Sequence, residues 1–148
     1  MKYFLIVIMF TFPFLGPSET SDGNNNSAIE DASSRIVIDT LSFSLKNLDY
    51  VLDRLNVKHK DIVIKQFILE TGWGKSYSFR KRNNLFGLYN SREHDFFIFQ
   101  HWTESVKGYK NSVQYKYKGG DYYKFLKDLP YAEDKGYIDK LREIKYDL

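Results

Sequence analysis

The 148-residue sequence contains no cysteine and only three prolines and two methionines. The absence of cysteine excludes disulfides, thiolate metal ligands, a cysteine nucleophile and a thiol for lipid attachment. The three histidines, His59, His94 and His101, lack the spacing of a zinc-binding motif, so neither a metal nor a cofactor is expected. No serine has the context of a nucleophile elbow, which gives no support to a serine hydrolase.

The sequence also lacks a strong bias of charge, because 22 basic and 19 acidic residues are spread along the chain and leave a formal net charge of +3. Nucleic-acid-binding domains usually carry a clustered basic face. The run Tyr115-Lys116-Tyr117-Lys118 alternates within a predicted helix, which together with the N-terminal export signal described below favours a solvated face or a contact with the cell wall, so no nucleic-acid partner is expected. Aromatic residues are abundant, with 12 Tyr and 12 Phe, and the 43% hydrophobic content predicts one folded domain.

The N-terminal region is interpreted as an export signal followed by a linker. Met1-Lys2 precede an apolar stretch that ends at Leu15 and then the small-residue site Gly16-Pro17-Ser18, and the stretch is short for a bilayer span. We expect residues 1–18 to be a signal peptide, or alternatively an uncleaved anchor, and the protein to reach a bacterial periplasm, cell surface or medium. Residues 19–37 are rich in Ser, Asn, Asp and Gly and predict a flexible linker, which leaves residues 38–148 for the domain.

Hydrophobic periodicity predicts a mostly helical α+β domain with one short β-hairpin. The first helix is expected at about 45–56 behind the N-cap residue Ser44, with a leucine stripe facing the core. The second is expected at 61–71 before a stop at Gly72. Its apolar residues surround most of the helix, which indicates burial by neighbours on several sides.

The second half of the domain predicts the hairpin and three more helices. Apolar and aromatic runs at 85–89 and 96–99 flank the polar segment 90–95, which indicates two strands and a loop. One helix is expected behind Thr103 as far as the glycines at 119–120, a shorter one from Tyr122 to the stop at Pro130, and a last one behind Asp134.

Glu70 is the residue for which chemistry is most strongly expected. It is the last polar side chain of an otherwise apolar helix and lies near the negative end of the helix dipole, and both conditions raise the pKa of a carboxyl. Glycoside hydrolysis needs a carboxylic acid that stays protonated near neutral pH, because the leaving sugar oxygen must receive a proton. The structural alternative is an ion pair of Glu70 with Arg80 or Arg82.

Three segments that occur in order along the chain resemble a known signature. They are Leu69-Glu70-Thr71-Gly72-Trp73-Gly74-Lys75-Ser76, Asn83-Asn84-Leu85-Phe86-Gly87-Leu88, and Tyr131-Ala132-Glu133-Asp134 with Tyr137-Ile138 and Leu141. Over about 45–144 the chain resembles the glucosaminidase domain of glycoside hydrolase family 73, the endo-β-N-acetylglucosaminidase type found in flagellar muramidases and autolysins. The resemblance implies a lysozyme-like fold, a peptidoglycan substrate and cleavage of the β-1,4 bond after N-acetylglucosamine.

The resemblance also implies roles for single residues. Glu70 matches the family's catalytic acid, and Tyr131 matches a tyrosine that faces the reacting sugar and supports catalysis. Trp73, Asn84 and Phe86 match motif positions beside the substrate cleft. From the residues alone, Trp73 could equally be a core anchor and Phe86 could pack under the hairpin.

The family's second carboxylate has no clear match in this sequence. Many members carry a Thr-x-Glu segment in a longer hairpin lobe, whereas this hairpin is short and leaves Glu93 and Asp95 as candidates. Glu104 ranks behind them because acidic residues are favoured in the first turn of a helix for structural reasons. If neither loop carboxylate acts, the N-acetyl group of the substrate would assist.

Two other functions stay open at the level of sequence. One is a peptidoglycan-binding module that kept the cleft but lost turnover with the shortened hairpin. The other is a lytic transglycosylase, which also uses one Glu in a lysozyme-like fold but forms an anhydro product. In each case the expected partner is the glycan strand of peptidoglycan, and a monomer is expected.

Overall fold

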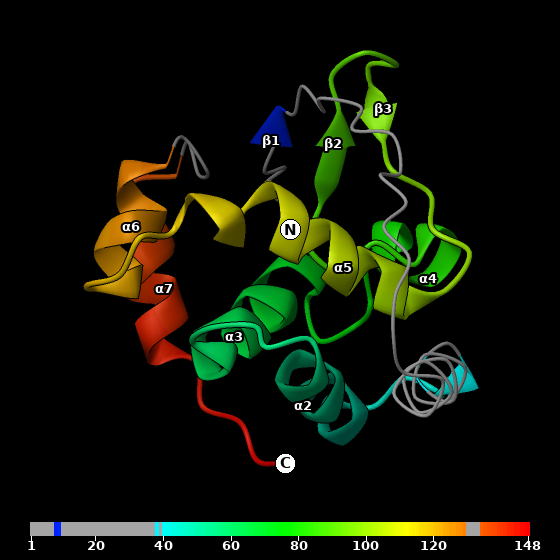
Figure 1. The fold of residues 1–148 in the computed structure, drawn as a ribbon, viewed down its shortest axis with the longest axis horizontal. Coiled ribbons are helices and arrows are strands. Elements are labelled where there is room, and N and C mark those ends of the chain that lie inside the picture. Colours follow the sequence, from blue (N-terminus) through cyan, green and yellow to red (C-terminus); the bar gives the residue numbers. More distant parts are fainter. Residues whose placement is uncertain (1–7, 10–37, 39, 130–133) are drawn as a thin grey trace, which may run out of the picture.

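The computed structural model describes residues 8–9, 38, 40–129 and 134–148. The predicted mostly helical α+β class is confirmed (Figure 1). No helix in these ranges is long and apolar enough to cross a membrane. The elements are β1 (Ile8–Met9), α2 (Leu45–Arg54), α3 (Lys60–Thr71), α4 (Tyr77–Arg82), β2 (Leu88–Asn90), β3 (Asp95–Phe96), α5 (Trp102–Ser112), the 3-10 helix η1 (Gln114–Lys116), α6 (Tyr122–Asp128) and α7 (Tyr137–Glu143).

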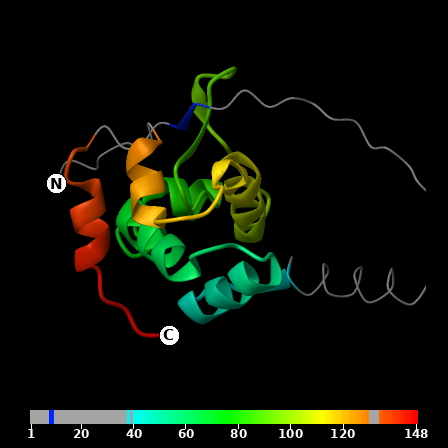
Figure 2. The same ribbon diagram turned by 60° about the vertical axis from the view of Figure 1, so that its left-hand side comes forward.

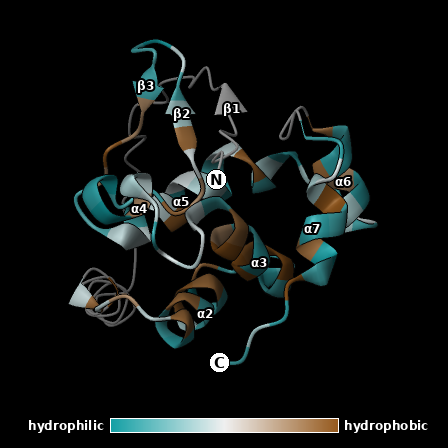
Figure 3. Ribbon diagram, turned by 180° about the vertical axis from the view of Figure 1, so that it is seen from behind, coloured by the Kyte–Doolittle hydropathy of each residue, from teal (hydrophilic) through white to brown (hydrophobic). Residues whose placement is uncertain are grey.

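Helix α3 lies at the centre of the helical part, with α2 and α7 packed against it. Seven of its residues are buried, and they point in several directions around the helix, so the predicted burial on several sides is confirmed. Figure 3 shows hydrophobic residues along α3, whereas the tip of the hairpin is hydrophilic. The buried residues of α3 are Ile62, Val63, Ile64, Gln66, Phe67, Ile68 and Thr71.

The ends of α2 and α3 follow the predicted signals. The Ser44 hydroxyl accepts the Asn47 N–H at 3.0 Å, which satisfies one of the free donors at the start of α2. Leu48 and Leu52 of the predicted stripe are fully buried, while the helix ends at Arg54, slightly before the predicted end. Gly72 ends α3 with a φ of 54°, a left-handed conformation that glycine adopts without steric strain.

Later helices differ from the prediction in detail. The N-cap of α5 is His101, and Thr103 lies inside the first turn. The helix ends at Ser112, and after Val113 the chain continues as the 3-10 helix η1. Helix α6 occurs where it was predicted. Asp134 precedes α7, and its Oδ1 accepts the Gly136 N–H at 2.8 Å.

Helix α4 was not predicted. It has only six residues, which is too short to show a hydrophobic period, and the local signal is its N-cap, Ser76, whose hydroxyl accepts the Phe79 N–H at 3.1 Å. The backbone N–H of Asn83 closes the helix by binding to the Phe79 carbonyl.

The predicted hairpin is confirmed as β2 and β3, which pair antiparallel with Tyr89 opposite Phe96. Its strands are shorter than predicted, because residues 85–86 lie in a buried loop rather than in β2. The strand β1, which pairs parallel with β2, was not predicted, since residues 8–9 fall within the proposed export signal (Figure 2).

Helix α5 approaches the hairpin closely at Gly108. A Cβ atom at this position would lie 3.0 Å from Cδ1 of Leu88 and 3.4 Å from Cζ of Phe99. The first distance is shorter than an ordinary van der Waals contact between carbon atoms, and the second lies at the short edge of that range. The Leu88 side chain therefore packs closely against α5 at position 108.

Candidate active site

Glu70 lies in the last turn of α3, one residue before the helix ends. The residue as a whole is partly exposed, but its carboxyl is surrounded by protein. Loss of solvent is the largest effect on this group and raises the pKa of Glu70 to about 8. The rise predicted from sequence is confirmed, and burial is its main cause.

The hydroxyl of Tyr137 in α7 donates a hydrogen bond to Oε1 of Glu70 at 3.1 Å. This bond favours the ionised carboxylate and lowers the pKa of Glu70, although less than burial raises it. Arg82, the partner that the structural alternative offered to Glu70, instead pairs with Asp95 at 2.6 Å. Glu70 is therefore placed as a desolvated acid with a neutral hydrogen-bond donor.

The turn after Glu70 presents Trp73 at the surface. Gly72, Trp73 and Gly74 have φ angles of 54°, 60° and 76°, so three successive residues adopt the left-handed conformation. The Thr71 hydroxyl holds this turn: it donates to the Phe67 carbonyl at 2.6 Å and accepts the Gly74 N–H at 2.8 Å. The Trp73 side chain is left 55% exposed, three positions along the chain from the acid.

Asn84 and Phe86, the other predicted substrate-binding residues, lie in the interior. The Asn84 side chain binds the Leu88 N–H and carbonyl at 2.9 and 2.8 Å and the Phe97 carbonyl at 3.1 Å. Phe86 is fully buried, with its ring centroid 4.5 Å from that of Tyr109. These contacts favour a structural role for both residues, and contact with a sugar stays a prediction.

The candidates for a second carboxylate lie in and beside the hairpin. Glu93 is exposed in the loop between the strands. Asp95 is bound by Arg82 and by the Phe96 N–H, and these contacts lower the pKa of Asp95. Glu104 accepts the Gln100 N–H at 2.9 Å, which is the structural role expected for an acidic residue at the start of α5. The other predicted catalytic residue, Tyr131, lies outside the described residues.

A hollow of about 750 Å³ opens between α6 and α7. Tyr137 forms part of its wall, and charged side chains of both helices form much of the rest, while Glu70 does not line it. In the part of the chain that the structure describes, no three His, Asp or Glu side chains gather as metal ligands would.

Sequence reasoning did not identify the partners of Glu70. Gln66, which binds the Tyr137 hydroxyl from one turn earlier in α3, could have been found, because residues four apart share one face of a helix. Tyr137 was noted only as part of a motif, and no local signal connects it with a residue so far away in the chain.

Comparison with known proteins gives one match. The sequence model of the family described as Glucosaminidase, mannosyl-glycoprotein endo-beta-N-acetylglucosaminidase, matches residues 46–148. No curated protein and no solved structure matches the chain, so the lysozyme-like fold implied by the resemblance stays a prediction.

Proposed function

Because this chain belongs to the glucosaminidase family of glycoside hydrolases, we propose that it is an exported enzyme that cleaves peptidoglycan after N-acetylglucosamine. Glu70 is the general acid in this proposal. The observation that carries it is the desolvated carboxyl of Glu70, which has a pKa of about 8 and so holds its proton at neutral pH. The motifs around Glu70 lie within the matched range.

The proposed reaction breaks the bond between C1 of N-acetylglucosamine and the bridging oxygen. As this bond breaks, Glu70 gives its proton to the oxygen, which leaves as a hydroxyl of the next sugar. Water supplies the new C1–O bond and loses a proton, so that Glu70 is restored and a reducing N-acetylglucosamine end is formed. The acid is worth about 10²- to 10⁴-fold in rate in such reactions.

The role of assisting water or stabilising the positive sugar has three candidates, Glu93, Asp95 and the N-acetyl group of the substrate. The low pKa of Asp95 keeps it ionised but makes it a weak base, which suits charge stabilisation better than removal of a proton from water. Glu93 is solvated in its loop. Assistance by the N-acetyl group requires neither carboxylate.

Export supports the choice of substrate, because peptidoglycan lies outside the cytoplasmic membrane. The charged start, the short apolar stretch and the small residues at 16–18 are the features on which the proposed export depends. Secretion of a tagged full-length chain, with and without residues 3–15, tests this part of the proposal separately from catalysis.

The decisive experiment incubates purified protein with peptidoglycan and identifies the soluble products by mass spectrometry. We expect fragments with new reducing N-acetylglucosamine ends from the wild type and from the control Glu143→Gln, at an exposed carboxylate of α7, and none from Glu70→Gln. Anhydromuramic ends would instead identify a lytic transglycosylase. Binding without soluble products from every variant would identify a binding module, and either result overturns the proposal.

A further inference from the structure

A continuous chain of side-chain hydrogen bonds runs through the core to Oε1 of Glu70. It combines residues of η1, α6, α5, α3 and α7, and each member except Glu70 itself is at most 8% exposed. In order, the members are Gln114, Tyr122, Tyr109, Gln66, Tyr137 and Glu70, and successive pairs are 3.0, 2.8, 2.6, 3.1 and 3.1 Å apart.

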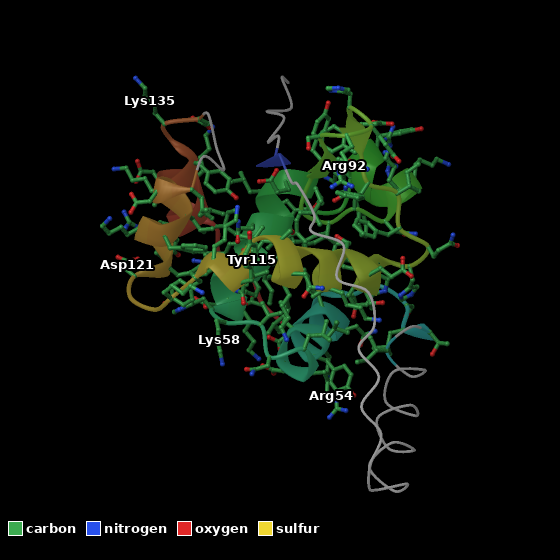
Figure 4. All side chains as sticks on the ribbon, turned by 45° about the horizontal axis from the view of Figure 1, so that its top comes forward. Arg54, Lys58, Arg92, Tyr115, Asp121 and Lys135 are labelled. Carbon is green, nitrogen blue, oxygen red and sulfur yellow. The ribbon has the colours of Figure 1, made fainter. Side chains whose placement is uncertain are left out.

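At the far end of this series of hydrogen bonds, backbone groups hold the side chain of Gln114. Gln114 accepts the Lys58 N–H with Oε1 at 2.8 Å and donates to the Lys58 carbonyl with Nε2 at 2.5 Å. These two bonds orient the amide, so that Nε2 also faces the Tyr122 hydroxyl. Figure 4 shows Lys58 at the outside of the molecule, beside the connection between α2 and α3.

The hydrogen bonds have one direction. Tyr109 donates its hydroxyl hydrogen to Oε1 of Gln66, so Tyr122 must be the donor between the two tyrosines. With its oxygen facing Tyr109, the Gln66 amide turns Nε2 to the Tyr137 hydroxyl, and Tyr137 in turn donates to Glu70. Every donor from Gln114 onward therefore points toward the carboxyl.

This direction has a consequence for the acid. The carbonyl oxygen of a carboxylic acid is the better hydrogen-bond acceptor, so a donor held on Oε1 by Tyr137 favours Oε2 as the oxygen that carries the proton of Glu70. We propose that Tyr137 and Gln66 are positioning residues, which hold the catalytic proton of Glu70 on Oε2. The use of that proton in glycoside hydrolysis rests on the proposed function, whereas its location rests on the hydrogen bonds alone.

Burial argues against a merely space-filling role for Gln66. Gln66 is fully buried among mostly apolar residues of α3, and burying an amide is unfavourable unless its groups are bonded. Both ends of the amide are used, one toward Tyr109 and one toward Tyr137. Among the described residues, Tyr137 from α7 is the side chain that acts on the pKa of the Glu70 carboxyl besides burial.

The test follows the titration of Glu70 by carbon NMR of its carboxyl, in a full chain labelled at glutamate. Tyr137→Phe should raise the pKa of Glu70 by about one unit, because a donor to the ionised form is lost. Gln66→Met should raise it less. The double variant should match Tyr137→Phe, because Gln66 acts through Tyr137. Tyr115→Phe, on the exposed side of η1 (Figure 4), is the matched control and should change nothing.

The second readout is the pH profile of kcat on peptidoglycan. In Tyr137→Phe the alkaline limb of this profile should shift to higher pH, by the same number of units as the pKa of Glu70 measured by NMR. The positioning role is overturned if the pKa of Glu70 is unchanged in a folded Tyr137→Phe protein. It is also overturned if the two substitutions shift this pKa additively in the double variant. Failure of the wild type to cut peptidoglycan while the titration moves as expected overturns the proposed function and leaves the positioning role standing.

Discussion

The Tyr137 hydroxyl lies 3.1 Å from Oε1 of Glu70, although 67 residues separate them in the chain. This contact brings α7, which follows α3 by four helices along the described part of the chain (α4, α5, η1 and α6), onto α3. Its hydroxyl lowers the pKa of Glu70, while burial raises it by a larger amount. The acidity of Glu70 is therefore a balance between burial of its carboxyl and one hydrogen bond that α7 provides.

The first prediction concerns the pH dependence of hydrolysis. The acid acts only while it is protonated, so kcat/KM should fall as pH rises through the pKa of Glu70, about 8. Above that value the loss should approach about tenfold per pH unit. The rate at which reducing ends are released between pH 5 and 10 measures this fall in activity. A fall centred near the ordinary pKa of glutamate would contradict the burial described for this carboxyl.

The second prediction concerns stability. The folded-state pKa of Glu70 is raised from 4.5 to about 8, so the folded protein binds more protons than the unfolded chain between these values. Its contribution to stability is therefore greatest below pH 4.5 and is lost as pH rises toward 8. Glu70→Gln removes this dependence. Between pH 4 and pH 7 the free energy of unfolding of the wild type should therefore fall by about 3 kcal/mol relative to that of Glu70→Gln.

Urea denaturation at several pH values measures this difference. The matched control is Glu93→Gln, since the same change at an exposed loop carboxylate should leave the pH dependence of the wild type intact. Parallel curves for wild type and Glu70→Gln would show that the carboxyl is solvated in solution.

The third prediction separates binding from stability at Trp73. Its φ of 60° is unfavourable for a large side chain, and glycine would relieve the strain. Trp73→Gly should therefore leave the free energy of unfolding within about 1 kcal/mol of the wild type. Loss of the exposed indole should weaken sedimentation of the protein with insoluble peptidoglycan about tenfold. Tyr50→Ala, at an exposed aromatic of α2, should leave sedimentation unchanged, and equal binding by Trp73→Gly would remove Trp73 from the substrate site.

The fourth prediction concerns Asn84. Its amide joins three backbone groups of the loop and hairpin, and each bond contributes about 1 kcal/mol. Asn84→Ala should lower the free energy of unfolding by about 3 kcal/mol, measured by urea denaturation. Asn111→Ala, on the exposed side of α5, provides the control and should be neutral. A stable Asn84→Ala protein that fails to bind glycan would reverse the structural interpretation.

The fifth prediction concerns the second carboxylate. Asp95 is exposed and already bound by Arg82, so its removal should affect the hairpin more than the chemistry. We expect kcat of Asp95→Asn to stay within about tenfold of the wild type, whereas removal of a catalytic base lowers rates by about 10²- to 10⁴-fold. Steady-state assays of Asp95→Asn, Glu93→Gln and the double variant decide between these residues and the N-acetyl group.

The parts of the fold that sequence predicted are those with local causes. Ser44 caps α2 because its hydroxyl reaches an N–H three residues later, and Gly72 ends α3 because it adopts a left-handed conformation. Glu70 belongs to this group, since the apolar helix around it already indicates burial. Each of these signals lies within one helical turn of the residue it concerns.

What sequence missed depends on contacts between distant segments. The bond from Tyr137 to Glu70 exists because α7 packs on α3, and the enclosure of Asn84 exists because the backbone of Leu88 and that of Phe97 meet around its amide. The pairing of residues 8–9 with β2 likewise has no local signal. Burial of Phe86 could have been inferred from its apolar neighbours, but its ring contact with Tyr109 could not.

The close approach of α5 to the hairpin at Gly108 bears on how this sequence can diverge. A methyl group there would lie 3.0 Å from Cδ1 of Leu88, so alanine requires that side chain to give way by a few tenths of an ångström. Larger side chains at position 108 need more adjustment, although the position takes no part in the proposed chemistry. In this protein a glycine in mid-helix marks where the Leu88 side chain approaches α5, and relatives that carry a larger residue there should compensate with a smaller one at 88.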